Sequence, residues 1–209
     1  MCRGVARERD APVRGAGPAD VAGPVRATIG RIVADELITP RLRLRRWRAQ
    51  DEAPMAAINR DPEVTRYLNR PVDDAAVAAF FGLVAAHWEE HGFGFWALES
   101  REPGSEGRFV GFVGVAYPAF LPALADRPEL GWRLAREAWG RGLASEAARA
   151  ARDDAFARLA VPELISIIHP ENVRSRRLAA RLGMAIERQV RNPVLDRDVE
   201  VWQLAAPGR

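Results

Sequence analysis

The sequence predicts one domain of the mixed α/β class, with a sheet of six to seven strands flanked by helices. At 209 residues, the chain has the length of a single domain that can bury most of its apolar surface. Short apolar runs of strand character alternate with segments whose apolar residues recur at helical spacing. Near the centre, a predicted strand over 129–135 meets a turn with two glycines, and that turn opens an alanine-rich helix. Strands and helices that alternate in this way indicate α/β packing.

Each element carries its own local signal. Asp51 and Asp73 are expected to begin the first two helices, and Asn172 caps the last one, which Gly183 ends. The apolar run 164–168 has the continuous character of an interior strand. The expected strands cover 42–47, 95–99, 109–116, 129–135, 164–168, 186–190 and 199–204, and the expected helices cover 51–59, 73–91, 143–159 and 172–182.

The charge distribution argues against nucleic-acid binding. All 31 basic residues are arginines, against 28 acids, and the whole net charge of +3 falls within residues 1–31. That stretch is rich in Ala, Gly, Pro and Arg and lacks aromatic residues, so we expect a disordered extension. The folded domain is expected over 32–206, where arginines and acids balance.

The single cysteine, Cys2, excludes an intramolecular disulfide and makes a thiol nucleophile a poor candidate. No apolar run approaches the ~20 residues of a membrane span, and the charged N-terminus has no signal-peptide core. A cytoplasmic protein without membrane attachment is therefore expected.

The stretch Trp139-Gly140-Arg141-Gly142-Leu143-Ala144-Ser145 is predicted to bind a phosphate. Glycines permit positive φ, so backbone N–H groups can converge there, and the helix N-terminus adds its own N–H groups and dipole. The chain contains no lysine, which excludes a P-loop. Ser145 stands where a dinucleotide fingerprint would have its third glycine. Alternatively, the turn only starts a helix.

This stretch resembles the pyrophosphate-binding signature of GNAT-superfamily acetyltransferases. Gly142 and Ala144 match its last two defined positions, while Trp139 replaces the leading Gln or Arg, as in the RimJ/RimL-like branch. Further segments resemble that branch in the family order, so that the resemblance spans about residues 36–205. These segments are 39–47, 61–68, 130–134, 170–175 and 181–184.

The resemblance implies a GNAT acetyltransferase fold with splayed central strands and acetyl-CoA as co-substrate, without a metal. The glycine turn would hold the pyrophosphate, and the backbone of Trp132, Arg133 and Leu134 would pair with the pantetheine arm, as in β-augmentation. The N–H of Leu134 would polarise the acetyl carbonyl. The implied cofactor-binding residues are Trp132, Arg133, Leu134, Trp139, Gly140, Arg141, Gly142, Leu143, Ala144, Ser145, Asn172, Arg176 and Arg177.

Two residues are candidates for proton transfer. Asn172 and Ser175 match the family's Asn-x-x-Ser, and helical spacing puts Ser175 on the same face as Leu178, Ala179 and Leu182. There its hydroxyl would protonate or orient the thiolate, or Ser175 is only a small packing residue. Glu129 stands where the branch carries a strand acid that faces the amine. As an alternative to general base, Glu129 would pair with a neighbouring arginine such as Arg127.

The acceptor side is predicted from Trp88, His91, Phe93 and Trp96 together with the loop 117–127, because aromatic rings attract a cationic amine. Core packing is the alternative for the two tryptophans. His87 and His91 formally match a zinc-protease pattern, but a third ligand and a buried setting are missing, so we predict no metal. His169 either lines the acceptor site or is a loop residue.

We therefore expect an acetyl-CoA-dependent N-acetyltransferase that moves an acetyl group directly to a primary amine, on a protein N-terminus or on a small molecule. A homodimer is compatible with this family. Two alternatives stay open: a non-catalytic protein that binds or senses acyl-CoA, and a basic-tailed protein associated with the ribosome or nucleic acid.

Overall fold

The computed structural model describes residues 1, 36–68, 73–192 and 196–208. The extension predicted over 1–31 thus lies outside the described residues, apart from Met1. None of the described helices is long and apolar enough to cross a membrane.

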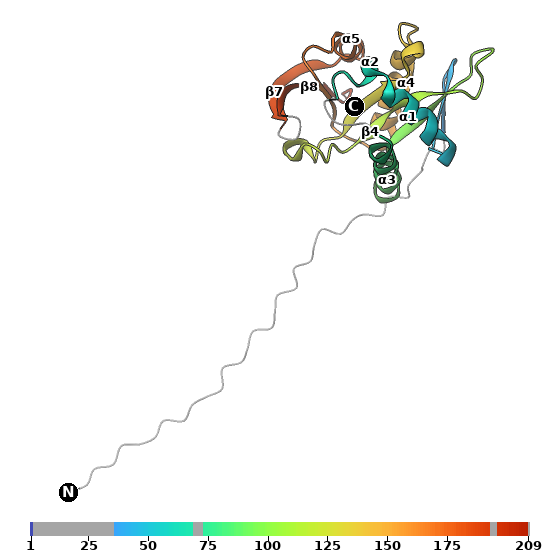
Figure 1. The fold of residues 1–209 in the computed structure, drawn as a ribbon. Coiled ribbons are helices and arrows are strands. Elements are labelled where there is room, and N and C mark those ends of the chain that lie inside the picture. The colour runs from blue at the N-terminus through green and yellow to red at the C-terminus, as the bar shows by residue number, and fades with distance from the viewer. Residues whose placement is uncertain (2–35, 69–72, 193–195, 209) are drawn as a thin grey trace. The chain divides into compact units, whose positions relative to one another are not determined.

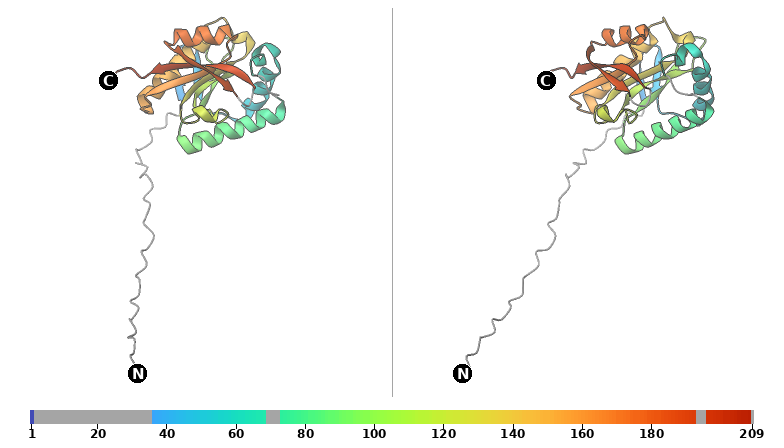
Figure 2. Two further views of the ribbon diagram at one scale, coloured as in Figure 1. Left: turned by 90° about the vertical axis from the view of Figure 1, so that its left-hand side faces the viewer. Right: turned by 60° about the vertical axis from the view of Figure 1, so that its left-hand side comes forward.

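A single eight-stranded sheet organises the domain, in the order β1-β2-β3-β4-β5-β6-β8-β7. Neighbouring strands are antiparallel except β5 and β6, which run parallel. The strands are β1 (Glu36–Ile38), β2 (Leu42–Arg45), β3 (Phe95–Ser100), β4 (Phe109–Ala116), β5 (Glu129–Leu134), β6 (Glu163–Ile168), β7 (Ala185–Asn192) and β8 (Arg197–Ala205). Figure 2 shows β7 and β8, in orange and red, on the side of the sheet that faces the viewer.

Within the described residues, five helices and three short 3₁₀ turns connect these strands, and Figure 1 shows how the helices lie around the sheet. The helices are α1 (Glu52–Arg60), α2 (Pro62–Thr65), α3 (Asp74–His91), α4 (Leu143–Arg158) and α5 (Val173–Arg181). The 3₁₀ turns are η1 (Ala49–Asp51), η2 (Pro122–Leu124) and η3 (Arg136–Ala138). The predicted mixed α/β class is confirmed, with two differences: the sheet gains β1, and α2 forms within 61–68. Both are too short to give a periodic signal.

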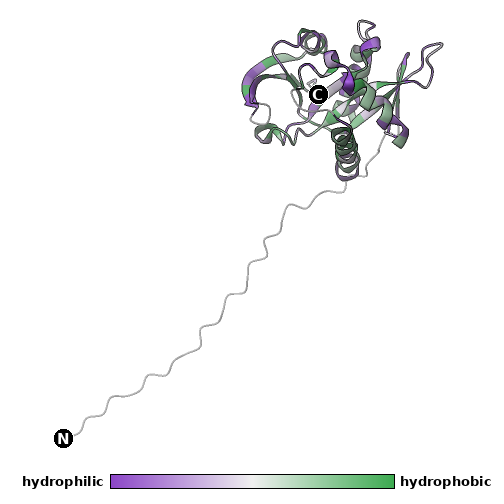
Figure 3. Ribbon diagram, viewed as in Figure 1, coloured by the Kyte–Doolittle hydropathy of each residue, from purple (hydrophilic) through white to green (hydrophobic). Residues whose placement is uncertain are grey.

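The two faces of the sheet are covered by different helices. Helix α4 packs on β2, β4 and β5 through a stripe of alanines, which includes the buried Ala147, Ala151 and Ala155. On the other face, α1 and α3 pack around Phe112. The outer strand β7 is mostly exposed and carries hydrophilic residues (Figure 3). The sheet therefore lies between two helical layers.

The caps follow the sequence signals. The carboxylate of Asp73 accepts from the N–H of Ala76, and Oδ1 of Asn172 accepts from the N–H of Ser175. Gly92 and Gly183 have φ of 72° and 87° where α3 and α5 end, as expected of glycines that end helices. Asn172 thereby fixes the start of α5 and the position of Ser175.

Asp51 does more than begin a helix. Its carboxylate is buried and accepts two hydrogen bonds, of 2.7 and 2.8 Å, from the guanidinium of Arg45. The Nε of Arg45 donates to Glu99 at 2.7 Å. The hydrogen bond to Asp51 outweighs burial and raises the pKa of Arg45. This network ties β2 to β3 and to the start of α1, and the alternation of the sequence did not predict it.

Candidate active site

The glycine turn has the predicted backbone conformation. Gly140 and Gly142 have φ of 74° and 80°, in the left-handed region that favours glycine. Gly142 is the N-cap of α4 and offers no side-chain cap. The first N–H groups of α4, which have no partner inside the helix, therefore stay available for an anion. A side chain at Gly140 would meet no atom within 4 Å, so the turn opens outward there.

Arg41, at the start of β2, holds this turn in place. Its Nη1 donates to the carbonyl of Arg141 at 2.7 Å, and its Nε donates to Glu146 at 2.7 Å. Glu146 also accepts from the hydroxyl of Thr39 at 2.6 Å and from the N–H of Arg41. Burial alone would raise the pKa of Glu146, but these donors outweigh it and lower the pKa.

The contact with Arg41 orients a peptide of the turn. Because C=O and N–H of one trans peptide point in opposite directions, the N–H of Gly142 points away from Arg41. A hollow of about 490 Å³ adjoins the Arg41 side and is lined in part by Ser145, Glu146 and Arg149. The turn therefore presents its amide on the side opposite Arg41.

The strands that lead to this turn separate as predicted for the family. Between β5 and β6 a single register pair, Glu129 with Ile165, is found among the described residues. Past that pair, the hydroxyl of Ser166 reaches the carbonyl of Leu130 at 2.6 Å. Beyond Leu130 the strands diverge, and the backbone of β5 borders an opening.

Alternation along β5 decides which backbone groups face this opening. The N–H of Ala135 donates to the carbonyl of Val110 on β4. Because successive residues of a strand turn their N–H and C=O groups to opposite sides, Arg133 also directs its backbone groups toward β4. Trp132 and Leu134 direct theirs toward β6. The carbonyl of Leu134 accepts from the indole of Trp139 at 3.0 Å. Trp139 thus links the strand to the glycine turn.

The prediction that Arg133 belongs to the cofactor side does not agree with this geometry. Its backbone pairs with β4, and its guanidinium donates to Oδ1 of Asn59 at 2.8 Å, on the α1 face. Leu143 is also fully buried, so only its backbone can contribute to the turn. The exposed side chain of Arg141 pairs with Glu102 at 2.5 Å. Ala144 and Ser145 lie half-buried in the first turn of α4, as predicted.

Trp132 and Ser175 meet across the opening. The indole Nε1 of Trp132 donates to Oγ of Ser175 at 3.2 Å, which joins β5 to the first turn of α5. Ser175 lies beside the buried Leu178 and Ala179, on the face that helical spacing predicted. Since the indole occupies an acceptor position of the oxygen, the hydroxyl hydrogen can point elsewhere.

Glu129 begins β5 and is half-buried. By strand alternation, its side chain lies on the face of the sheet to which a side chain at Gly131 would point. A Cβ atom at Gly131 would lie 3.0 Å from the ring of Phe95, on the side of α1 and α3. Glu129 and Ser175 therefore approach the opening from opposite faces of the sheet. Arg127, the alternative partner of Glu129, is bound instead to Glu163 at 2.6 Å and Glu187 at 2.8 Å.

The arginines of α5 are placed differently from the prediction. The Nε of Arg176 donates to the buried Glu200 at 3.0 Å, so this charge is already compensated. Arg177 is exposed. Arg174 is not among the predicted cofactor-binding residues, but its guanidinium lies over the ring of Trp139 at 4.5 Å, next to the glycine turn.

Three of the four predicted acceptor residues are core side chains. Trp88, Phe93 and Trp96 are 3, 8 and 2% exposed, and the rings of Trp88 and Trp96 pack edge-on at 4.5 Å. The indole of Trp88 also donates to the carbonyl of Phe95 at 3.0 Å. A ring enclosed in this way has no surface left for an amine, so the acceptor assignment for these three residues is corrected to core packing.

The two histidines of α3 bind protein groups. His87 contacts the carbonyl of Phe93 through Nδ1 at 2.7 Å, and its Nε2 accepts from the N–H of Tyr117 at 3.0 Å. Both ring nitrogens are therefore occupied, and burial lowers the pKa of His87. His91 is half-buried, and its ring packs against Tyr117 at 5.0 Å, on the loop 117–127.

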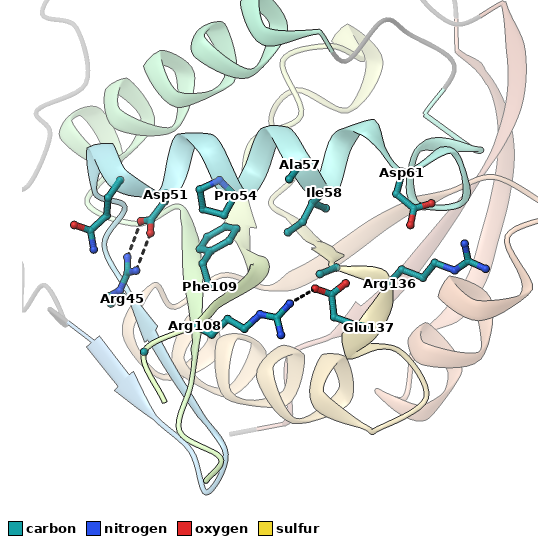
Figure 4. A pocket seen from close by; sticks show the side chains of 13 residues that line it. Arg45, Asp51, Pro54, Ala57, Ile58, Asp61, Arg108, Phe109, Arg136 and Glu137 are labelled. Atoms are coloured by element: carbon teal, nitrogen blue, oxygen red, sulfur yellow. Dashed lines mark hydrogen bonds and ion pairs between the residues drawn. The ribbon is translucent and has the colours of Figure 1, made fainter. Parts of the chain in front are cut away.

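A cavity of about 510 Å³ lies beneath α1 (Figure 4). Its lining includes the Arg45–Asp51 pair at one end and the Arg108–Glu137 pair, with a distance of 2.6 Å, near η3. It includes neither the glycine turn nor Trp132, Ser175 or Glu129. The predicted catalytic residues and the glycine turn therefore lie outside this cavity.

A strand, a positive-φ glycine turn and an uncapped helix N-terminus lie beside two diverging parallel strands, and the backbone N–H groups of this arrangement can receive a phosphate. The chain belongs to the GNAT acetyltransferase family, whose domain model matches residues 41–185. Members of this family use acetyl-CoA as donor. Among the described residues, no group of three His, Cys, Asp or Glu side chains could hold a metal ion.

Relatives and solved structures agree with this family. The chain is 28% identical over 160 residues to the uncharacterised protein YkkB of Bacillus subtilis, covering 75% of this chain and 88% of YkkB. An acetyltransferase structure from Agrobacterium tumefaciens superposes with a TM-score of 0.70 and 28% identity, over 81% of this chain and 93% of that one.

The branch within the family is less sharply defined. Mycobacterium smegmatis RimJ in complex with CoA-disulfide superposes with a TM-score of 0.62 over 79% of this chain and 82% of its own. At 20% identity this likeness shows the fold alone. The finer RimJ/RimL assignment therefore stays a prediction.

Proposed function

We propose that this enzyme transfers an acetyl group from acetyl-CoA to the primary amine of an acceptor. The observation that carries the proposal is the uncapped α4 N-terminus with Gly140 and Gly142 at positive φ, directly beside the strands that diverge past Glu129 and Ile165. The turn would bind the pyrophosphate. The extended pantetheine arm would run along the backbone of Trp132 and Leu134.

The residues at the opening then have distinct tasks. The amine nitrogen forms a bond to the acetyl carbon, and the bond from that carbon to sulfur breaks. Glu129, directly or through water, takes the proton that the amine loses, while the hydroxyl of Ser175 passes a proton to the departing thiolate and regains one from solvent water. The N–H of Leu134 faces the opening and would stabilise negative charge on the carbonyl oxygen.

The test is a thiol-release assay over a panel of amines with acetyl-CoA. We expect turnover with at least one amine, and a Glu129→Gln variant should flatten the acidic limb of the pH–rate profile, because its amide cannot be a base. The matched variant Glu187→Gln changes a carboxylate outside the opening and should leave the profile unchanged. Binding of acetyl-CoA without turnover of any amine would favour a non-catalytic acyl-CoA-binding protein instead.

A further inference from the structure

We propose that the acceptor is an amine that also carries a carboxylate, and that Arg197 at the start of β8 binds this carboxylate. The inference rests on the proposed acetyltransferase function and specifies its substrate class. It starts from the face of the sheet opposite α5.

Register and alternation determine which side chains share that face. Ile168 pairs with Glu200, and Glu200 turns toward Arg176 of α5. Residues of odd number on β6 and β8 therefore face the other side, where Ile165 and Val201 pack with Leu121 and Leu124 of the η2 segment. Arg197 belongs to this second face, the one that Glu129 shares.

Arg197 has a buried donor without a partner. Its Nη2 donates to the carbonyl of Tyr67 at 2.9 Å, but its Nε is buried and makes no hydrogen bond within the described part of the chain. Ion pairs of 4 Å or less with an acid are likewise absent for Arg197 among the described residues. Residues 69–72 and 193–195, which border this region in sequence, contain no Asp or Glu.

A bound anion would stabilise the positive charge of Arg197 at this position. Burial lowers the pKa of Arg197, which means that its surroundings disfavour the charge. The Nε–H of this guanidinium has no partner, and a carboxylate that accepts from it would restore part of the lost solvation.

His169 and Tyr67 complete the setting. Their rings stack with centroids 5.2 Å apart, and the guanidinium of Arg66 lies 5.5 Å from the Tyr67 ring. Nδ1 of His169 accepts from the N–H of Glu171, so Nε2 carries the hydrogen and is a second donor. Burial and the nearby Arg197 lower the pKa of His169, while Glu171 and Glu200 oppose this shift. Glu200 is occupied by Arg176 and Trp202, which leaves Glu171 as the nearby acid.

The position along the strands fits an acceptor that spans the opening. Glu129 is level with Ile165 in the parallel register, and His169 directly follows β6 at the end where the two strands have separated. An amine that approaches the thioester between these strands would extend its remaining atoms toward His169 and Arg197. A polyamine, which is cationic at both ends, would meet like charge there.

The experiment compares amines that differ only in a carboxylate, each assayed with saturating acetyl-CoA. Suitable pairs are phenylalanine with phenethylamine, leucine with isoamylamine, and 4-aminobutyrate with butylamine, with spermidine as a polycation without a carboxylate. In the preferred pair, we expect kcat/KM to be roughly 10- to 100-fold higher for the amine with the carboxylate than for the amine without it, as a charged hydrogen bond implies. Arg197→Gln should remove this preference, Arg197→Lys should keep part of it, and KM for acetyl-CoA should not change.

Arg191→Gln is the matched control, because Arg191 lies on the same hairpin and is paired with Asp196 at 2.8 Å. Equal kcat/KM for both members of every pair, or an equal loss for both in Arg197→Gln, would overturn the inference while leaving acetyl transfer intact. If no amine turns over, calorimetry with phenylalanine and phenethylamine on the CoA-saturated protein decides the question: no selective binding of the carboxylate would overturn it. A melting curve of each variant verifies folding, and Arg197→Lys serves where the Gln variant unfolds.

Discussion

The indole Nε1 of Trp132 and the hydroxyl oxygen of Ser175 lie 3.2 Å apart, although 43 residues separate them in the chain. This contact joins the strand that borders the opening to the helix that Asn172 caps. Because the indole donates this hydrogen bond, the hydroxyl hydrogen of Ser175 stays available for another acceptor. The contact supports the proton-donating role proposed for Ser175.

Removal of the hydroxyl should therefore affect the rate more than binding. For Ser175→Ala we expect kcat to fall by roughly 10²–10⁴-fold if Ser175 is the principal acid, with a nearly unchanged Kd for CoA. Trp132→Phe, which keeps a ring but removes the N–H, should give a smaller fall in kcat. Steady-state kinetics with calorimetric CoA binding measure both. A loss of melting temperature with an unchanged rate per folded molecule would assign Ser175 to packing.

The phosphate site proposed at the glycine turn can be tested by comparing two glycines that have similar positive φ angles. Gly140 and Gly104 have φ of 74° and 80°, and a Cβ at either would meet nothing within 4 Å. Alanine should cost each about 1–2 kcal/mol in the left-handed region. Only Gly140→Ala should also weaken acetyl-CoA binding, because the added methyl group occupies the space of the phosphate. Equal CoA affinity in the two variants would refute the phosphate site.

Arg174 is expected to bind the 3′-phosphate of CoA, since it lies over Trp139 beside the turn, whereas Arg176 is paired with Glu200. Arg174→Ala should lower the affinity for CoA but leave that for dephospho-CoA unchanged. Arg176→Gln should lower neither affinity. It removes the ion-pair partner of Glu200, so it should reduce the melting temperature. Calorimetry with both ligands separates these effects, and an equal loss for both ligands in Arg174→Ala would argue against contact with the 3′-phosphate.

His87 should make the folded state sensitive to acid. Its pKa is lowered by burial, so the unfolded chain binds the proton more readily than the native protein does. The stability that His87 contributes is complete above the unfolded pKa of ~6.5 and is lost as pH falls from there through the lower native pKa. The melting temperature should thus drop between pH 7.5 and 5, with a shallower slope in His87→Gln. His91→Gln keeps both contacts of His87 but removes the ring whose charge also lowers the pKa of His87, so its slope should lie between those of the wild type and His87→Gln.

The N-terminal stretch is expected to be dispensable, because it carries the positive surplus and offers no apolar anchor. A chain that begins at Gly30 should melt and acetylate like the full chain. Reduced turnover of the shortened chain, restored by the full one, would assign the stretch a part in acceptor binding.

The turns, the helix caps and the order of strands and helices could be predicted from the sequence, because they depend on local chemistry. Glycines at positive φ and a capping asparagine act within a few residues, so the turn at Gly140 and Gly142, the start of α5 at Asn172 and the alternation of strands and helices could be predicted. The separation of β5 and β6, in contrast, was implied only by the family resemblance.

Tertiary structure alone decided the partners of side chains far apart in the chain. In the sequence, Trp88 and Trp96 are two aromatic residues that could line an acceptor site. In the structure they pack against each other and are buried in the core. Arg41 reaches the glycine turn 100 residues away, and Arg176 rather than Arg174 is neutralised, because β8 brings Glu200 beside it. Pattern and propensity describe neighbours along the chain. Which charge is compensated depends on contacts that form only when the sheet assembles.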